Sequence, residues 1–255
     1  MSETALPTRD IMGVRVTAAT ADEAIADINA RRARGERIKL GFLNAHTSNL
    51  AGRDAAFRAV LDGFTILNDG VGVDIAGRVL HGARFPENLN GTDFTPRFLT
   101  ETKTSARIYL LGGLPGVAGM AGTRIAELAP QHVIAGAYHG YFHAWEEAGI
   151  VTAINALKPD ILLVALGNPG QEKFIDRNFA ALECSVAVGV GALFDFLSGR
   201  VSRAPAAFRA VRMEWVYRLG REPGRLWQRY LLGNSKFLWR LLWARWRGAG
   251  ARRSS

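Results

Sequence analysis

Short apolar runs alternate with longer amphipathic stretches along most of the chain. The runs are rich in Val, Ile and Leu and are bounded by Gly, Pro, Asn or Asp, a pattern typical of buried strands. They predict strands at 38–43, 64–67, 107–111, 132–137, 161–166 and 185–190. Between them, apolar residues three and four apart predict helices at 20–33, 48–61, 71–80, 92–102, 117–128, 145–157 and 171–182.

Two of these helices have clear start signals. Thr20-Ala-Asp-Glu23 is a capping box, with Ala24, Ile25 and Ile28 on the apolar side of the helix that follows. Thr92 is placed to cap the helix over 92–102.

Alternating strands and helices predict an α/β fold, with a Rossmann-like parallel sheet flanked by helices. In such a sheet ligands bind at the carboxyl ends of the strands, where loops and helix N-termini converge. From Pro205 onward the pattern is helical only. We therefore expect an α/β domain over residues 1–198 and a helical appendage over 199–255.

Charge separates the same two parts. The 255 residues carry a net charge of +9. Residues 199–255 hold 14 Lys/Arg and two acids, and five of the six tryptophans, whereas the first 198 residues have a net charge of −3. The partner of the basic part is expected to be anionic: lipid head groups, a diphosphate or nucleic acid.

The composition excludes several classes of protein. Cys184 is the only cysteine, so an internal disulfide is excluded and a reducing compartment fits. No apolar run reaches the length of a membrane span. Residues 1–10 lack the pattern of a signal peptide, and we expect a cytoplasmic chain.

Asp69 is the first candidate for chemistry. It lies in Asn68-Asp-Gly-Val-Gly72, just past a predicted strand and at the start of a helix. The glycines permit a tight turn and leave the carboxylate at the ligand edge. The alternative is that Asp69 caps the following helix.

Two further turns lie at the same edge. Gly112-Gly-x-x-Gly116 resembles a phosphate-binding turn, although it is neither a P-loop nor a G-x-G-x-x-G motif, and it is equally explained by a need for positive φ. Gly167-Asn-Pro-Gly-Gln171 begins a helix, where Gln171 can donate to a substrate oxygen, or the segment is ordinary turn chemistry.

Metal and nucleophile chemistry find little support. His139 and His143 have a metal-like spacing, but Gly140 interrupts the helix that would place them on one face. Asp-x-Asp and Gly-x-Ser-x-Gly motifs are absent, and Cys184 starts a buried strand. We expect no metal and no cofactor.

The appendage has three interpretations. Arg and Trp on amphipathic helices suit a membrane surface, and Phe237, Leu238, Leu241 and Leu242 form an apolar stripe at helical spacing. The alternatives are nucleic-acid binding, for which no motif is present, and a plain helical bundle. A membrane-docking appendage is favoured, because the apolar and aromatic residues are too numerous for a helical surface that is only charged and solvated.

The order of several motifs resembles the WecG/TagA/CpsF glycosyltransferase family, glycosyltransferase family twenty-six. The resemblance covers roughly residues 14–232. The motifs are Leu67-Asn-Asp-Gly-Val-Gly72, Asn90-Gly-Thr-Asp93, Tyr109-Leu-Leu-Gly-Gly113, His139-Gly-Tyr-Phe142, Pro159-Asp-Ile-Leu-Leu-Val164, Gly167-Asn-Pro-Gly-Gln-Glu172, Val188-Gly-Val-Gly-Ala-Leu-Phe-Asp195, Gly199-Arg-Val-Ser-Arg-Ala-Pro205, Glu214-Trp215 and Arg218-Leu-x-x-Glu-Pro-x-Arg225.

The resemblance implies an inverting, metal-independent transfer of a sugar from a UDP-sugar to a polyprenyl-diphosphate-linked saccharide. Members are peripheral proteins on the cytoplasmic face of the bacterial inner membrane. They build teichoic acid linkage units, common antigen or exopolysaccharide. The family's general base falls on Asp69, its substrate-contacting amide on Gln171, and an aspartate near the nucleotide on Asp195. Its arginine-bearing appendage docks on the membrane and closes over the site.

The substrate-binding residues expected from these motifs and turns are Asn44, Thr47, Gly70, Asp93, Gly112, Gly113, Asn168, Gln171, Asp195, Arg203, Arg212, Arg218, Arg221 and Arg225. Two positions depart from the family pattern. Phe42 stands where many members have threonine, and Asn88 where they have arginine. Both are expected near the donor or acceptor pocket, so the sugar specificity of the best-known members is not carried over. The sequence leaves the oligomeric state open.

The main competing function is that of a nucleotide-cofactor-dependent oxidoreductase of Rossmann type. The imperfect glycine motif and the lack of a hydride-site pair count against it. A basic nucleic-acid-binding module is disfavoured because the basic residues avoid the sheet domain. No nucleic-acid partner is therefore expected.

Overall fold

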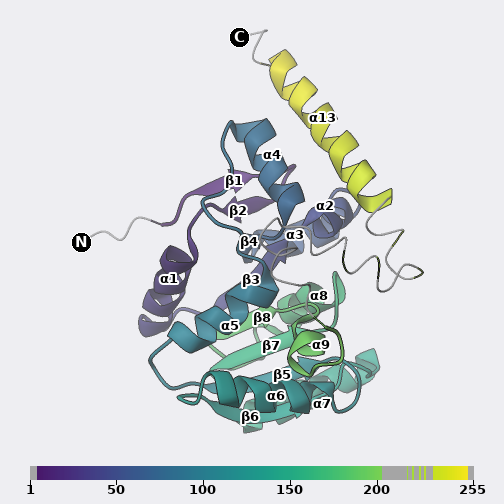
Figure 1. Ribbon diagram of the computed structural model, residues 1–255. Helices are drawn as coiled ribbons and strands as arrows, with labels where there is room; N and C mark the ends of the chain where they lie inside the picture. Colours follow the sequence, from purple (N-terminus) through teal and green to yellow (C-terminus); the bar gives the residue numbers. More distant parts are fainter. Residues whose placement is uncertain are drawn as a thin grey trace.

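A computed structural model describes residues 5–202, 217, 220, 224, 227 and 232–251 (Figure 1). The strands are β1 (Thr8–Asp10), β2 (Arg15–Thr17), β3 (Ile38–Leu43), β4 (Thr65–Asn68), β5 (Arg107–Gly112), β6 (Val133–Tyr138), β7 (Ile161–Ala165) and β8 (Val186–Gly189). The helices are α1 (Ala21–Ala33), α2 (Ala45–Ala51), α3 (Ala55–Asp62), α4 (Val71–His81), α5 (Gly91–Glu101), α6 (Val117–Leu128), the 3-10 turn η1 (Ala144–Glu146), α7 (Glu147–Ala156), α8 (Gly170–Asn178), α9 (Leu193–Leu197) and α13 (Gly233–Ala251).

The strands form one eight-stranded sheet in the order β1-β2-β4-β3-β8-β7-β5-β6. Every neighbouring pair is parallel except β1 and β2, which are antiparallel. The predicted α/β fold with a parallel sheet flanked by helices is confirmed. The strands β4, β3, β8, β7 and β5 are neighbours, so their carboxyl ends form one continuous edge.

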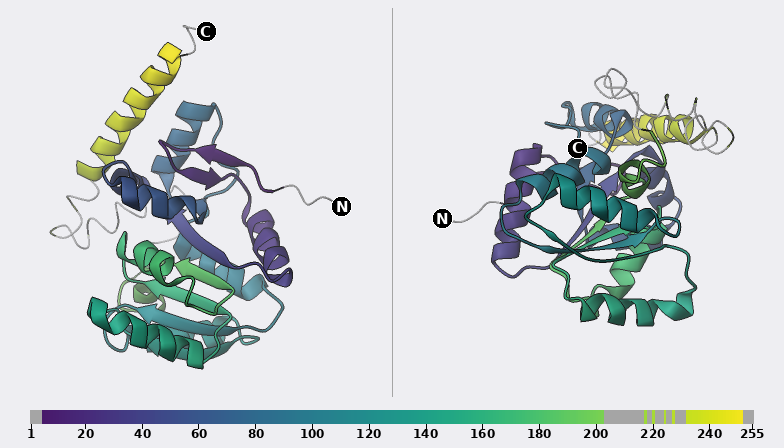
Figure 2. Two further views of the ribbon diagram at one scale, coloured as in Figure 1. Left: turned by 180° about the vertical axis from the view of Figure 1, so that it is seen from behind. Right: turned by 60° about the horizontal axis from the view of Figure 1, so that its bottom comes forward.

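Helices cover both faces of the sheet, as the views in Figure 2 show. One apolar core joins α1, α5, α6 and α9 to the sheet, and a second joins α3, α4, α7, α8 and α13 to the opposite face. Successive residues of β7 alternate between the two cores: Leu163 belongs to the first and Leu162 to the second. This alternation follows from the two-residue period of a strand, and it explains why the central strands are apolar throughout.

The capping box predicted at Thr20 is present, with both reciprocal hydrogen bonds between Thr20 and Glu23. Two other helix predictions need correction. The single helix predicted over 48–61 is two helices, α2 and α3, because Asp54 accepts from the Phe57 amide and starts a new helix. The cap of α5 is Asn90 rather than Thr92, since the Asn90 side chain accepts from the Asp93 amide.

Three elements, β1, β2 and α9, were not predicted. β1 and β2 form a short antiparallel pair at one edge of the sheet, with Arg9 opposite Val16. The five-residue helix α9 follows β8 and buries Leu193 and Phe194. Strands of three residues and a helix of little more than one turn are too short to show a periodicity.

The C-terminal helix α13 packs against α2 and α4 and extends past the end of the sheet (Figures 1 and 2). Phe237 and Leu241 are 1% exposed and belong to the core of that face. Leu238 and Leu242, predicted to lie on the same stripe, are exposed instead. The helix therefore has one apolar side buried in the protein and another facing outward.

Polar contacts also join α13 to α2. The Asn49 side chain donates to the Gly233 carbonyl at 2.7 Å, and Arg240 donates to the Ser48 carbonyl at 2.8 Å. Within the described residues, no helix is both long and apolar enough to span a membrane. The division into residues 1–198 and 199–255 stays a prediction.

Candidate active site

Asp69 and Asn44 meet at the carboxyl ends of two adjacent strands. β3 and β4 are paired so that Leu43 lies opposite Asn68, which brings the next residues, Asn44 and Asp69, side by side. The Asn44 Nδ2 donates to Asp69 Oδ2 at 3.0 Å. Asp69 is half-buried, so its carboxylate lies at the edge of the sheet and is held by a neighbouring side chain.

Asn44 is itself fixed by α2. It is the N-cap of that helix, and its Oδ1 accepts from the Thr47 amide at 3.0 Å and from the Thr47 hydroxyl at 3.2 Å. Since the oxygen of the Asn44 amide faces the helix, its nitrogen must face Asp69. Two of the predicted binding residues, Asn44 and Thr47, thus orient the candidate base, and Thr47 is 1% exposed.

The turn after Asp69 leaves the carboxylate outside the helix cap. The N-cap of α4 is Gly70, with φ +85°, and no side chain caps this helix. The Asn88 side-chain oxygen accepts from the Gly70 amide at 2.8 Å. Asn88, which stands where the family pattern has arginine, therefore supports the backbone beside Asp69.

A second polar group lies at the ends of β7 and β8. The side-chain nitrogens of Asn168 and Gln171 both donate to Glu172 Oε1, the Gln171 bond at 2.8 Å. The Gln171 oxygen accepts from the Gly191 amide at 3.0 Å. Gln171 is 2% exposed, so the predicted binding amide is held inside the edge of the sheet rather than extended from it.

Glu172 is a buried acid at this edge. It is 1% exposed, and its Oε2 is buried without a hydrogen-bond partner. Burial raises the pKa of the Glu172 carboxyl to about 7, although hydrogen bonds from Gln171 and Asn168 oppose the rise. Such a group exchanges its proton near neutral pH, which is uncommon for a glutamate outside a functional site.

The glycine turn after β5 completes this edge. Gly112 and Gly113 have φ of +137° and +69°. A Cβ on Gly112 would lie 2.3 Å from the Ala165 oxygen, and the Gly113 amide donates to that oxygen at 3.1 Å. Gly112 and Gly113 are therefore required for the positive φ of this turn. The turn ends at the N-terminus of α6, where backbone amides can bind an anion.

Two other predicted binding residues, Asp195 and Asp93, each have a polar partner close to them in sequence. Asp195, on α9, is half-buried and forms a 3.9 Å ion pair with Arg200. Asp93 is exposed, and Asn90 of its own helix cap donates to it at 2.8 Å. The five predicted arginines, Arg203, Arg212, Arg218, Arg221 and Arg225, lie outside the described residues.

Phe42 occupies a buried position rather than the edge. It is 7% exposed and packs edge-on against Phe94, with ring centroids 6.2 Å apart. A Cβ on Gly91 would lie 2.9 Å from its ring, so Phe42 and the start of α5 are in close contact. A threonine at position 42 would be too small to make this contact with the Phe94 ring.

The candidate base and the amide group are separated by intervening strands. β4, which Asp69 follows directly, and β7, which ends three residues before Asn168, are three strand spacings apart in the sheet. At about 4.8 Å a spacing this is about 14 Å. The two groups do not touch each other, and a single elongated ligand could contact both.

Among the residues that the structure describes, this edge has neither a cluster of metal ligands nor a reactive thiol. In the part of the chain that the structure describes, no group of three or more His, Cys, Asp or Glu could hold an ion. His139 Nδ1 accepts from the Tyr141 amide, while His143 stacks on Trp145. Cys184 is fully buried, and burial raises the pKa of its thiol to about 11.

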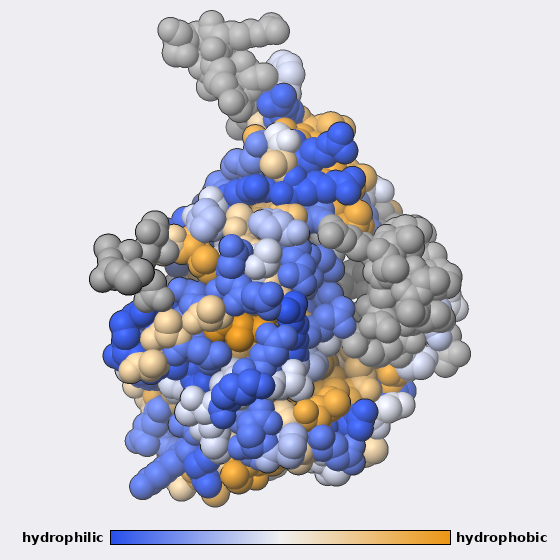
Figure 3. All heavy atoms as spheres, turned by 60° about the vertical axis from the view of Figure 1, so that its left-hand side comes forward, coloured by the Kyte–Doolittle hydropathy of each residue, from blue (hydrophilic) through white to orange (hydrophobic). Residues whose placement is uncertain are grey.

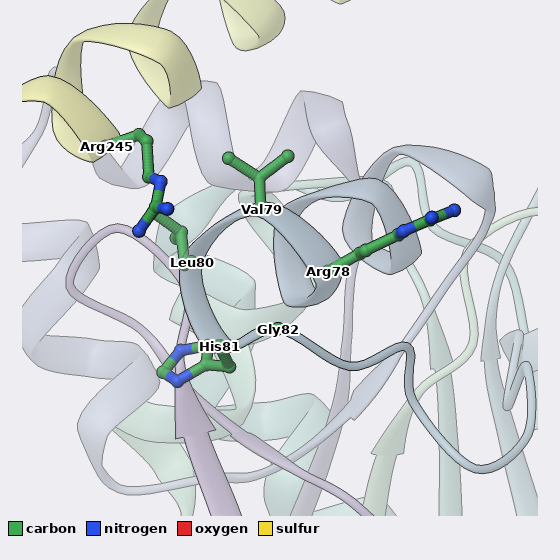
Figure 4. Close-up of a pocket in the computed structure, with 6 residues that line it drawn as sticks. All are labelled: Arg78, Val79, Leu80, His81, Gly82 and Arg245. Atoms are coloured by element: carbon green, nitrogen blue, oxygen red, sulfur yellow. The ribbon is translucent and has the colours of Figure 1, made fainter.

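A surface hollow of about 570 Å³ lies away from this edge, between the C-terminal end of α4 and α13. Its lining residues are Arg78, Val79, Leu80, His81, Gly82 and Arg245. Figure 4 shows Arg245 extending from α13 toward Leu80 and His81, whereas Arg78 points away. Because α4 has 11 residues, this hollow is about 16 Å from the Asp69 end of the helix.

Sequence reasoning assigned no role to two residues that the structure brings into the site. Glu172 ends the Gly167–Glu172 motif, and the signal that could have singled it out is its position beside Gln171 at the start of a helix that follows a buried strand. Asn88 was noted only as a departure from the family pattern. Its bond to the Gly70 amide bridges 18 residues of sequence, and no local pattern reports such a contact.

The fold and this edge define an α/β protein with a ligand site at the carboxyl ends of a parallel sheet. Comparison with known families makes the assignment specific: residues 9–251 match the model of the "Glycosyl transferase WecG/TagA/CpsF family". The chain belongs to this family.

Two curated relatives are similar to this chain. Both are named N-acetylglucosaminyldiphosphoundecaprenol N-acetyl-beta-D-mannosaminyltransferase, one from Bacillus spizizenii and one from Bacillus subtilis. Each is 35% identical over 167 residues, which is 65% of this chain. The match spans 63% and 64% of the length of the two relatives, respectively.

Proposed function

We propose that this protein is an inverting glycosyltransferase that moves a sugar from a UDP-sugar to a polyprenyl-diphosphate-linked saccharide in bacterial cell-surface polysaccharide synthesis. The observation that carries the proposal is the Asp69 carboxylate at the ligand edge of the sheet, oriented by the 3.0 Å bond from Asn44. Family membership over residues 9–251 supports the reaction class.

Asp69 is the general base in this proposal. An acceptor hydroxyl that approaches the edge gives its proton to Asp69 as its oxygen forms a bond to the anomeric carbon of the donor sugar. The bond from that carbon to the diphosphate breaks on the opposite side, so the configuration inverts and UDP leaves with the electron pair. Asn44 keeps the carboxylate directed at the hydroxyl throughout.

The leaving diphosphate needs positive groups, because the transfer uses no metal in this proposal. The N-terminus of α6, reached through the Gly112–Gly113 turn, offers backbone amides. Arg203, Arg212, Arg218, Arg221 and Arg225 are proposed to supply positive charge from the appendage. Asp195, Gln171 and Asn168 are proposed to contact the nucleotide end of the donor.

The separation of the two polar groups supports a ligand of this shape. The strands that precede Asp69 and Asn168 lie about 14 Å apart in the sheet, and a nucleoside diphosphate sugar is elongated. Its sugar would lie near Asp69, and its nucleoside near the ends of β7 and β8. The relatives are named for transfer of N-acetylmannosamine to N-acetylglucosaminyl diphosphoundecaprenol. Phe42 is buried against Phe94 and Asn88 accepts from the Gly70 backbone amide, so these two departures are explained by packing and backbone support, and we propose the same donor and acceptor here.

Membrane attachment is proposed to use α13. Its outward side carries Trp239, Leu242 and Trp246, each more than 60% exposed. Tryptophans at the head-group level beside Arg and Lys are typical of interfacial helices. The face of the molecule seen in Figure 3 is largely hydrophilic, with separate apolar areas. We propose a peripheral protein on the cytoplasmic face of the inner membrane.

The test is turnover of the full chain with a panel of UDP-sugars and polyprenyl-diphosphate saccharides, with the linkage of the product determined. We expect transfer from UDP-N-acetylmannosamine with inversion at the anomeric carbon. A product that retains the donor's configuration, or no transfer from any UDP-sugar, would overturn the proposal.

A further inference from the structure

Glu172 lies between two side-chain amides and directs both. Its Oε1 accepts from Asn168 Nδ2 and from Gln171 Nε2. An ionised carboxylate can only accept hydrogen bonds, so each amide must turn its nitrogen toward it. The side-chain oxygen of Asn168 is thereby left on the other side of its amide, at the end of β7.

Gln171 is fixed at both ends. Its nitrogen faces Glu172, and its oxygen accepts from the backbone amide of Gly191, which can only donate. There is room for this arrangement because residue 189 is glycine: a Cβ there would lie 2.9 Å from the Gln171 nitrogen. The orientation therefore depends on an acceptor on one side and a donor on the other.

The burial of the Glu172 carboxylate is energetically costly. Glu172 is 1% exposed, and Oε2 has no partner, so the group bears a desolvation cost that only one of its oxygens offsets. A residue that served only to fill this space would be apolar. A hydrogen-bond acceptor at this position fixes the orientation of the Asn168 and Gln171 side-chain amides.

We propose that Glu172 is a positioning residue for the proposed transfer: its carboxylate sets which way the half-buried Asn168 amide faces toward the donor nucleotide, and it holds the buried Gln171 amide in place beside it. The inference rests on the proposed function for the identity of that ligand. The orientation of the amides is a property of the protein alone, and it can be tested without substrate.

Protonation of Glu172 would weaken this control, because a neutral carboxyl is a poorer acceptor and carries a donor of its own. Several charged groups on and around α8 form ion pairs that do not include Glu172: Lys173 pairs with Asp54 at the start of α3, and Lys39 of β3 pairs with Asp176. Arg177 pairs with Glu147 of α7, while Arg58 and Asp62 also lie on α3. The strands β7 and β8 carry no ionisable residue.

The first experiment follows the side-chain NH₂ signals of Asn168 and Gln171 by ¹⁵N NMR between pH 5.5 and 8.5, on the full chain without ligand. We expect both signals to titrate with one midpoint near pH 7, because the pKa of Glu172 is about 7. Glu172→Gln should abolish the titration. The control Glu183→Gln makes the same change at an exposed acid and should preserve it. Signals that do not titrate, or that titrate unchanged in Glu172→Gln, would overturn the proposal.

The second experiment measures transfer at pH 8 with UDP-N-acetylmannosamine. Glu172→Met removes the acceptor at similar volume and should raise the KM for the donor roughly tenfold, the worth of one hydrogen bond, with kcat changed less. Glu172→Gln keeps an acceptor oxygen but loses the charge, so its KM for the donor should lie between those of the wild type and Glu172→Met. A merely structural role would lower the amount of folded protein without this KM-selective effect.

The outcomes separate this inference from the proposed function. If the wild type transfers sugar but both Glu172 variants have its KM, Glu172 does not position the donor site and the inference is wrong. If the amide signals titrate as expected but the wild type uses no UDP-sugar, the proposed function fails, while the control of the amides by Glu172 stands.

Discussion

The side chains of Asn44 and Asp69 are joined by a 3.0 Å hydrogen bond although 25 residues separate them in sequence. The bond forms because β3 and β4 are parallel neighbours in register. In addition, the Asn44 side-chain oxygen caps α2, so its nitrogen faces Asp69. One residue thus starts a helix and orients the candidate base of the neighbouring strand.

The role of Asp69 can be tested by Asp69→Asn. The variant keeps the size of the side chain but cannot take a proton, so turnover should fall by about 10²–10⁴-fold. Because α4 is capped by Gly70, the fold and donor binding should be preserved. Turnover and calorimetric binding of UDP would check this. Near-normal turnover would remove Asp69 from the mechanism.

Asn44→Ala separates helix capping from orientation of the base. Loss of the cap should cost about 0.5–2 kcal/mol of stability. Turnover should also fall, by about tenfold or more, because Asp69 loses its hydrogen-bond donor. Thr20→Ala is the matched control, since Thr20 caps α1 and its side chain bonds to Glu23 of that helix. If the two variants lose stability and activity in parallel, Asn44 acts only as a cap.

The buried carboxyl of Glu172 should make stability fall as pH rises. The pKa of this group is about 7 in the folded protein and lies near 4.5 when it is exposed, so the folded state binds more protons between these values. The stability contribution is complete below about pH 4.5 and is lost as pH rises through 7, up to about 3 kcal/mol. Urea unfolding of wild type and Glu172→Gln at several pH values would show it: the variant should gain on the wild type from pH 5 to pH 8. A constant difference would contradict the raised pKa.

Two substitutions on α13 should have opposite consequences. Phe237 is 1% exposed in the core, so Phe237→Ala should cost about 3–5 kcal/mol. Trp239 is 67% exposed, so Trp239→Ala should change stability by less than about 0.5 kcal/mol but weaken binding to phosphatidylglycerol vesicles. Denaturant unfolding and vesicle co-sedimentation would measure the two effects. Unchanged vesicle binding by a Trp239→Ala, Trp246→Ala double variant would argue against this face as the docking surface.

Chelation should leave transfer intact. The described residues offer no cluster of metal ligands, and the sequence lacks an Asp-x-Asp motif. Assays with EDTA and with added Mg²⁺ or Mn²⁺ would decide. Turnover that is lost in EDTA and restored by either ion would show that a metal, rather than arginines and helix N-termini, stabilises the leaving diphosphate.

Much of the fold could be predicted because its elements are long and periodic. The strand at 38–43 and the helix at 117–128 have the predicted bounds. The helix predicted over 48–61 was wrong because its apolar spacing continues across the turn at Gly52–Asp54. β1 and β2 depend on pairing with each other and with β4, which is a tertiary effect.

The site was predictable at the level of its edge but not of its contacts. Topology places residues that follow parallel strands along one edge, so Asp69, Asn168 and Gln171 were expected there. Which of them touch depends on strand order and register, which the sequence does not state. The burial of Glu172 could not be predicted, because an acid on a helix is ordinarily exposed and only the packing of α8 against the sheet buries it.

The anchoring of α13 by Phe237 and Leu241 has a kinetic consequence. Because these side chains are locked into the core, the outward tryptophans keep a fixed orientation relative to the sheet. A protein that rests on a bilayer through them would meet its lipid-linked acceptor by diffusion in two dimensions. Its rate would then follow the number of acceptors per unit area of membrane, and diluting the acceptor with inert lipid would slow it even at constant bulk concentration.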